Sequence, residues 1–125
     1  MNQLTDAVLT LITKASTDLP PDVEGAIRGA WEREPEGSMA RKTFGTILEN
    51  IDLARKKVTP ICQDTGALLF FVDYPRGSDE RPLVEAIHEA VKEATGRYIL
   101  RPNAVDPVSG KNSGNNLGVN APYIH

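Results

Sequence analysis

The spacing of apolar residues predicts three helices in the first half of the chain. Apolar side chains recur every three or four positions over residues 4–17, from Pro21 to just before Pro35, and from Ser38 to about Lys57. Pro21 suits a first helical turn, because its missing N–H is not needed there, and Ser38 can cap the third helix. We expect three buried faces: Leu4, Val8, Leu11, Ile12 and Ala15; Val23, Ala26, Ile27, Ala30 and Trp31; and Phe44, Ile47, Leu48, Ile51 and Ala54.

The pattern changes after Pro60. Residues 67–74 form an almost continuous apolar run of strand length, bounded by Gly66 and Pro75. A run without polar alternation is typical of a strand that is covered on both sides. The sequence therefore predicts a strand buried on both faces.

A fourth helix is predicted to open at Pro82 and to run to about Thr95, with Gly96 as its stop. Residues 98–100 favour a short second strand. The expected inward face of this helix is Val84, Ile87, Val91 and Ala94.

The remaining residues, 101–125, are rich in Pro, Gly and Asn and show no helical period. Few apolar anchors are available to offset the cost of ordering the backbone. We therefore expect the tail from about Asp106 onward to lack a packed environment, or to pair with a neighbouring chain. The predicted organisation of the chain is a helical region over 1–57, a strand and a helix over 58–100, and a substrate-loop tail over 101–125. It indicates an α+β fold, or a piece of a larger α/β unit.

Composition narrows the function classes. A chain of 125 residues is the size of one domain, and its net charge of −3 offers no basic surface for nucleic acid. No apolar stretch is long enough to cross a bilayer, and the first residues lack the basic start of a signal peptide. We expect a cytoplasmic location, where the only cysteine would stay reduced.

That cysteine, Cys62, lies in the stretch PICQDTG, and its residues alone leave three interpretations open. A nucleophile would need His88 or His125 as a base and a carboxylate such as Asp64. A metal ligand would need further ligands from another chain or from sequence outside this one. A structural role would make Cys62 a small buried residue at the start of a strand.

Polar residues near Cys62 and in the tail favour a binding site. Gln63 and Asp64 offer hydrogen-bonding groups beside the thiol, and the same residues would also suit a turn. In the tail, Arg101 is the residue type suited to bidentate carboxylate binding. The neighbouring residues would equally suit a solvated loop: Asn103, Lys111, Asn112 and Asn115.

Taken together, PICQDTG, the later RPNAVDPVSGKNSGNN and the lead-in ILENIDLARKKVT resemble the amino-terminal part of the iron–sulfur hydro-lyases, the class I fumarases and tartrate dehydratases. The resemblance implies a 4Fe–4S cluster held by three cysteines, of which Cys62 matches the first. It implies that Gln63 and Asp64 lie in the substrate pocket and that Arg101 binds a carboxylate of a small dicarboxylate. An iron without a protein ligand would act as the Lewis acid.

The chain departs from that family by ending before the other two cysteines and the catalytic base. We therefore expect residues 1–125 to be an amino-terminal fragment, with no catalytic residue of its own, inactive alone and without a stable cluster. Its partners would be the rest of the same enzyme or a beta-type subunit, in a homo- or hetero-oligomer. Fumarate/malate and tartrate both remain open as substrates. The alternatives are a freestanding, non-catalytic binding module and a cysteine hydrolase.

Overall fold

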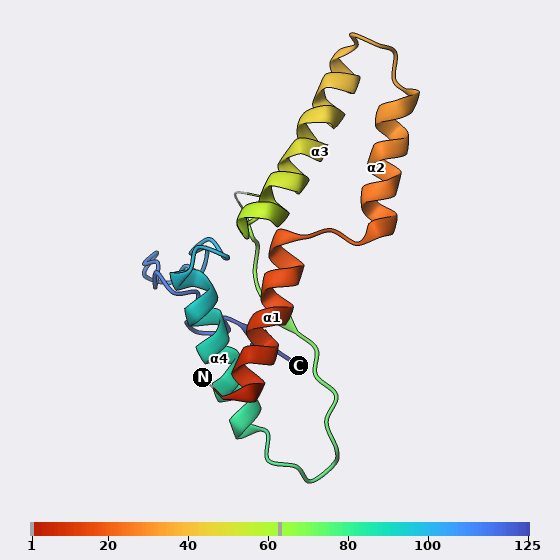
Figure 1. Cartoon of the computed structure of the whole chain (residues 1–125). Helices are drawn as coiled ribbons and strands as arrows, with labels where there is room; N and C mark the ends of the chain where they lie inside the picture. Colours follow the sequence, from red (N-terminus) through yellow and green to blue (C-terminus); the bar gives the residue numbers. More distant parts are fainter. Residues whose placement is uncertain (1, 63) are drawn as a thin grey trace.

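A computed structural model describes residues 2–62 and 64–125. These residues form four helices and one sheet of two short strands: α1 (Gln3–Thr17), α2 (Pro21–Arg33), α3 (Met39–Lys57), β1 (Leu69–Phe70), α4 (Arg81–Gly96) and β2 (Tyr123–Ile124). Helices α1 and α4 lie side by side, whereas α2 and α3 form a hairpin that extends away from them (Figure 1). We call α1, α4, the sheet and the tail the body, and α2 with α3 the arm. The four helices and the mixed α+β composition confirm the prediction.

Local signals set the helix boundaries. The side chain of Asn2 accepts a hydrogen bond from the backbone N–H of Thr5 at 2.8 Å, and α1 begins there. Ser38 caps α3 as predicted, accepting from the N–H of Arg41 at 3.1 Å. At the other end of α3, Val58 has a φ of 54°, a left-handed conformation that is strained for a β-branched residue. None of the described helices is long and apolar enough to span a membrane.

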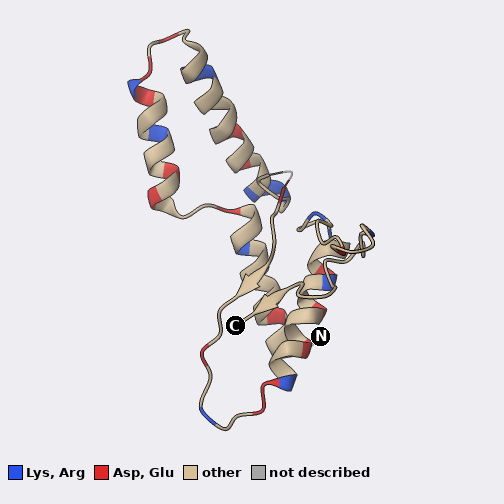
Figure 2. Cartoon of the chain, turned by 180° about the vertical axis from the view of Figure 1, so that it is seen from behind, with Lys and Arg blue, Asp and Glu red and all other residues tan. Residues whose placement is uncertain are grey.

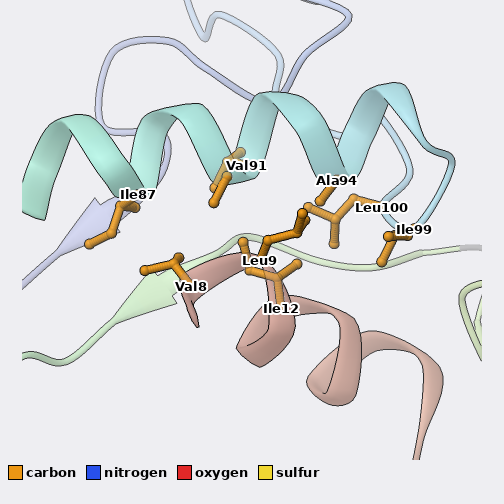
Figure 3. Packing of buried hydrophobic residues seen from close by; sticks show 9 residues of the cluster. Val8, Leu9, Ile12, Ile87, Val91, Ala94, Ile99 and Leu100 are labelled. Atoms are coloured by element: carbon orange, nitrogen blue, oxygen red, sulfur yellow. The ribbon is translucent and has the colours of Figure 1, made fainter. Parts of the chain in front are cut away.

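The core of the body lies between α1 and α4. Figure 3 shows Val8, Leu9 and Ile12 of α1 facing α4, with Ile99 and Leu100 closing one end. Three of the residues predicted for the inward face of α4 are buried here: Ile87, Val91 and Ala94.

The predicted buried face of α1 is wrong in part. Leu4 and Leu11 are 39% and 60% exposed, and Ala15 is exposed too, whereas Thr5 and Leu9 are buried. The reason is that α1 has apolar residues on two faces, and only one of them meets α4. The helical period correctly predicts the helix, but it does not show which face packs against another element.

The arm buries much less than the sequence suggested. No residue of α2 is fully buried, and Val23 and Ala26 are exposed. Helix α3 buries only Leu48, Ile51 and Ala54. Two helices that cover each other on one side leave the rest of each surface in solvent. Charged residues of both signs are spread along the arm (Figure 2).

Polar contacts compensate for this sparse core. Arg41 of α3 lies over the ring of Trp31, 4.3 Å from its centroid, and its Nη1 lies within 2.9–3.4 Å of three carbonyl oxygens at the end of α2. At the opposite end of the arm, Arg55 pairs with Asp18 after α1 and with Glu24 of α2. Arg41 thus joins α3 to the last residues of α2, and Arg55 joins α3 to the first turn of α2 and to the residue that follows α1.

The strand predicted over residues 67–74 is wrong in length and in burial. Only Leu69–Phe70 is a strand, and it pairs in parallel with Tyr123–Ile124. Leu68, Phe70 and Val72 pack on the body core, whereas Leu69 and Phe71 are 54% and 78% exposed. Helices cover one face of this sheet, and no described element covers the other.

The second strand is also not where it was predicted. Residues 98–100 form a turn and bend, in which Tyr98 takes a φ of 61° and the N–H groups of Ile99 and Leu100 approach the carbonyl of Ala94 at the end of α4. Their burial comes from wrapping over the end of that helix.

The last part of the tail is packed, contrary to expectation, whereas residues 107–114 are exposed as expected. The N–H of Tyr123 donates to the carbonyl of Leu68 at 2.9 Å, and that of His125 donates to Phe70 at 2.8 Å. Leu117 and Ile124 contact the body core. The expectation was based on the small number of apolar residues in the tail. It did not include the hydrogen bonds that the tail forms with β1 of its own chain.

Candidate functional site

The loop that carries Cys62 is fixed at its start by two helices. The N–H of Ile61 donates to the carbonyl of Ser16 in α1 at 3.0 Å, and the side-chain amide of Asn50 in α3 donates to the carbonyl of Ile61 at 2.8 Å. The next residue, Cys62, is a free thiol exposed to solvent. The interpretation of Cys62 as a buried structural residue is therefore wrong. Gln63, predicted to bind substrate, lies outside the described residues.

The loop is fixed again at Asp64 and Thr65. An Asp64 oxygen accepts from the N–H of Gly66 at 2.8 Å and from the side chain of Asn103 at 2.9 Å. The hydroxyl of Thr65 accepts from the N–H of Arg101 at 3.2 Å. The two sequence stretches PICQDTG and RPNAVDP, 36 residues apart at this contact, therefore meet through hydrogen bonds.

A residue that the sequence did not single out organises the tail side of this junction. Asn116 is 6% exposed, and its side chain bonds to the backbone of residues 101, 103 and 104 and to Thr95. In the sequence, Asn116 is one of several Asn residues in a polar stretch that is typical of a loop. No local signal distinguishes it, because its burial depends on the end of α4.

A cleft of about 750 Å³ lies beside the junction. Asp64 and Leu68 line one side, and tail residues including Asn103 and Lys111 line the other. Asp106 also lines it, and hydrogen bonds from the backbone and hydroxyl of Ser109 hold the pKa of Asp106 below its ordinary value. The cleft thus combines a cationic amine with carboxylates and amide groups, a set that can bind a small polar ligand.

The structure places Arg101 and the histidines differently from Asp64. The backbone of Arg101 is fixed at the junction, while its side chain is exposed and does not line this cleft. His88 is an exposed residue of α4, and His125 stacks between Phe71 and Tyr123. Among the described residues, no hydrogen bond joins either histidine to Cys62.

The residues present can supply part of an iron–sulfur site. Cys62 is exposed and free, so its thiolate can act as one iron ligand. Within residues 2–62 and 64–125, no three His, Cys, Asp or Glu side chains gather as a metal site. Because Cys62 is also the only cysteine of the sequence, a cluster bound here would need its other ligands from outside these 125 residues.

Comparison with known proteins assigns the chain to a family. The family described as fumarate hydratase (Fumerase) matches residues 5–125. The chain belongs to this family. The resemblance drawn from the two motifs is thereby confirmed, and it extends over both the body and the arm.

Relatives in the fumarate hydratase family carry two kinds of name. A provisionally named fumarate hydratase class I of Geobacillus stearothermophilus is 43% identical over 99% of this chain. A provisionally named L(+)-tartrate dehydratase subunit alpha of Methanocaldococcus jannaschii is 34% identical over 98% of it, and the L(+)-tartrate dehydratase subunit alpha of Escherichia coli K12 is 32% identical over 99%. The chain spans 24%, 44% and 41% of the lengths of these relatives, respectively.

Proposed function

We propose that this chain is the amino-terminal part of a cytoplasmic iron–sulfur hydro-lyase, which hydrates fumarate to malate reversibly or dehydrates tartrate. The observation that carries the proposal is the hydrogen-bonded junction between the Cys62 loop and the Arg101 loop. Two stretches that are unremarkable alone are brought together beside a cleft, in a chain whose relatives are named for these two reactions.

Each residue has a role in the proposal. Cys62 is one thiolate ligand of a 4Fe–4S cluster, and the remaining ligands come from the rest of the same enzyme or from a beta-type subunit. When bound, the cluster supplies a Lewis acid for the departing hydroxyl. Gln63 and Asp64 contact the substrate, and Arg101 binds one carboxylate through its planar guanidinium.

The geometry of the described residues supports the role of Asp64. Hydrogen bonds from Gly66 and Asn103 fix an oxygen of Asp64, so this carboxylate is held before substrate arrives. The exposed guanidinium of Arg101 extends from a fixed backbone. Lys111 is the cation among the lining residues, beside Asp64 and Asp106, and it can pair with one carboxylate of the substrate.

The test uses the complete coding sequence, expressed without oxygen and assayed with fumarate and with L(+)-tartrate. Cys62→Ser should abolish activity with either substrate. Arg101→Ala should raise KM by about 10- to 100-fold, because hydrogen bonds to charged groups contribute about 1.5–3 kcal/mol. Arg97→Ala is the matched control, since Arg97 is an exposed arginine that pairs with Glu93 on α4. Equal KM values for the two variants would remove Arg101 from the substrate site.

A second test separates the enzyme from a non-catalytic binding module. The 125-residue chain should hold far less than four irons after anaerobic reconstitution, because one thiolate cannot replace three. About four irons per chain would contradict the ligand assignment. A complete coding sequence without further cysteines would overturn the cluster and leave the binding module as the better function.

A further inference from the structure

The tail residue Asn116 has the most heavily bonded side chain of the described junction. We propose that Asn116 is the positioning residue of the substrate cleft, which sets the Arg101 loop against the Cys62 loop. This inference rests on the proposed function, because it gives Asn116 a task in that same site.

The hydrogen-bonding capacity of Asn116 is fully used inside the protein. Its Nδ2 donates to Thr95 Oγ1 at 3.0 Å and to the carbonyl of Arg101 at 2.8 Å. Its Oδ1 accepts from the N–H groups of Asn103 and Ala104 at 2.8 and 3.0 Å. An amide side chain has two donor hydrogens and two acceptor lone pairs, so none is left for a ligand. Asn116 therefore acts by holding other residues.

The residues that Asn116 holds lead directly to the carboxylate of the site. Asn103 donates through its side chain to Asp64 and lies 3.3 Å from the hydroxyl of Thr65. Arg101 donates through its backbone to that same hydroxyl. The path from Asn116 to Asp64 thus passes through one residue, Asn103.

The other end of this network is anchored in the body core. Thr95 is 6% exposed and lies in the last turn of α4, where its hydroxyl donates to the carbonyl of Val91 at 2.8 Å. Val91 is fully buried against α1. Asn116 therefore transmits the position of the rigid core to the cleft wall, which is the condition for a preorganised site.

The backbone at Asn116 permits a clean substitution. Its φ is 60°, a left-handed conformation that Asn tolerates and Gly adopts without strain. Asn116→Gly thus removes the four side-chain bonds while keeping the turn. Asn120 offers a matched control, because its φ is 57°, its side chain is exposed, and it forms no side-chain hydrogen bond within the described residues.

Amide hydrogen exchange by NMR in the 125-residue chain tests the holding step. In Asn116→Gly, the amide of Ala104 should exchange at least about tenfold faster, since it loses its acceptor. The amide of Asn103 also donates to the carbonyl of Arg101 at 2.9 Å, so it should be accelerated by a smaller factor. The amides of Ile87 and Val91 in α4 should keep their rates, and Asn120→Gly should change none of the four. Unchanged exchange at Asn103 and Ala104 would overturn the proposal, and so would an equal acceleration in α4.

Kinetics of the complete enzyme test the link to substrate. Asn116→Gly should raise KM for the dicarboxylate about tenfold with a smaller change in kcat, while Val108→Gly, at a tail residue outside the cleft, should leave KM unchanged. A lower Tm with unchanged KM would mean a merely structural role and would overturn the assignment. If the unmutated complete enzyme converts no dicarboxylate, the proposed function fails and the substrate part of this inference with it, whereas accelerated exchange would still identify Asn116 as the residue that holds the loop.

Discussion

The body and the arm are built from similar amphipathic helices but are stabilised by different means. In the body, α1 and α4 bury a shared apolar face, and six residues of α4 are buried, among them Ile87 and Val91. In the arm, α2 buries none. There, Arg41 and Arg55 join α3 to α2, and Arg55 also joins α3 to Asp18 at the end of α1. The difference shows that helical periodicity predicts a helix equally well in both regions, while the means of stabilisation depends on how many neighbours the helix finds.

The strongest test of this contrast removes core volume from the body. Ile87→Ala should lower the free energy of unfolding by about 2–5 kcal/mol, because Ile87 is 1% exposed and its loss leaves a cavity. Urea unfolding followed by circular dichroism measures the change. Leu11→Ala is the control on α1, where a residue 60% exposed should cost no more than about 0.5 kcal/mol. A loss at Leu11 as large as that at Ile87 would mean that the outer face of α1 is covered in solution.

A smaller and more local effect is expected at the far end of the arm. Arg41→Met removes the cation from the face of Trp31 and the donor from the end of α2, for a loss of about 1 kcal/mol. Faster hydrogen exchange in α2 and a changed Trp31 fluorescence would report it, while α4 should be unaffected. Lys42→Met, at the next position of α3, is the control for losing a positive charge. Equal exchange in the two variants would show that Arg41 does not hold the arm.

The smallest expected effect is a pH dependence where the arm meets the body. Hydrogen bonds from Arg55 lower the pKa of Asp18 and of Glu24 below their ordinary values of 3.8 and 4.5. These carboxylates therefore stabilise the contact between the arm and the body fully at a pH above their ordinary pKa values. Their contribution is lost as pH falls through the lower pKa values of the folded state. Salt should weaken the effect, since the groups are at the surface.

Carboxyl-carbon NMR titration of Asp18 and Glu24 measures these two pKa values. Arg55→Met should return both toward 3.8 and 4.5. Lys56→Met should leave both low, because Lys56 forms no ion pair within the described residues. Unshifted titrations in the Arg55 variant would assign the low values to another cause.

Much of the helical structure could be predicted from sequence because its signals are local. Ser38 and Pro21 mark the helix starts within one turn, and the apolar period gives the length. The sheet could not be predicted in the same way. β1 pairs with Tyr123–Ile124, and nothing near either strand in the sequence identifies the partner. The same limit explains why the outer face of β1 was expected to be buried.

In the candidate site, too, local features of the sequence could be predicted, whereas contacts between distant residues could not. Cys62, Gln63, Asp64 and Arg101 could be proposed from residue types and motif resemblance, and the roles assigned to all four stay predictions. The groups that join the two motifs, Thr65 and Asn116, could not be found, because Ser, Thr and Asn in polar stretches are typical of loops. What distinguishes Asn116 is its burial against Thr95, a property of the folded chain.

The parallel pairing of β1 with β2 also bears on the order of folding during synthesis. All of α4 and most of the tail separate the two strands, so the sheet is a long-range contact that can close only after β2 has left the ribosome. The arm, whose helices are adjacent in sequence, can form well before that moment. A nascent chain should therefore expose Phe70 and Val72 until the end of β2 emerges, which makes this stretch the natural target for a chaperone that binds extended apolar segments.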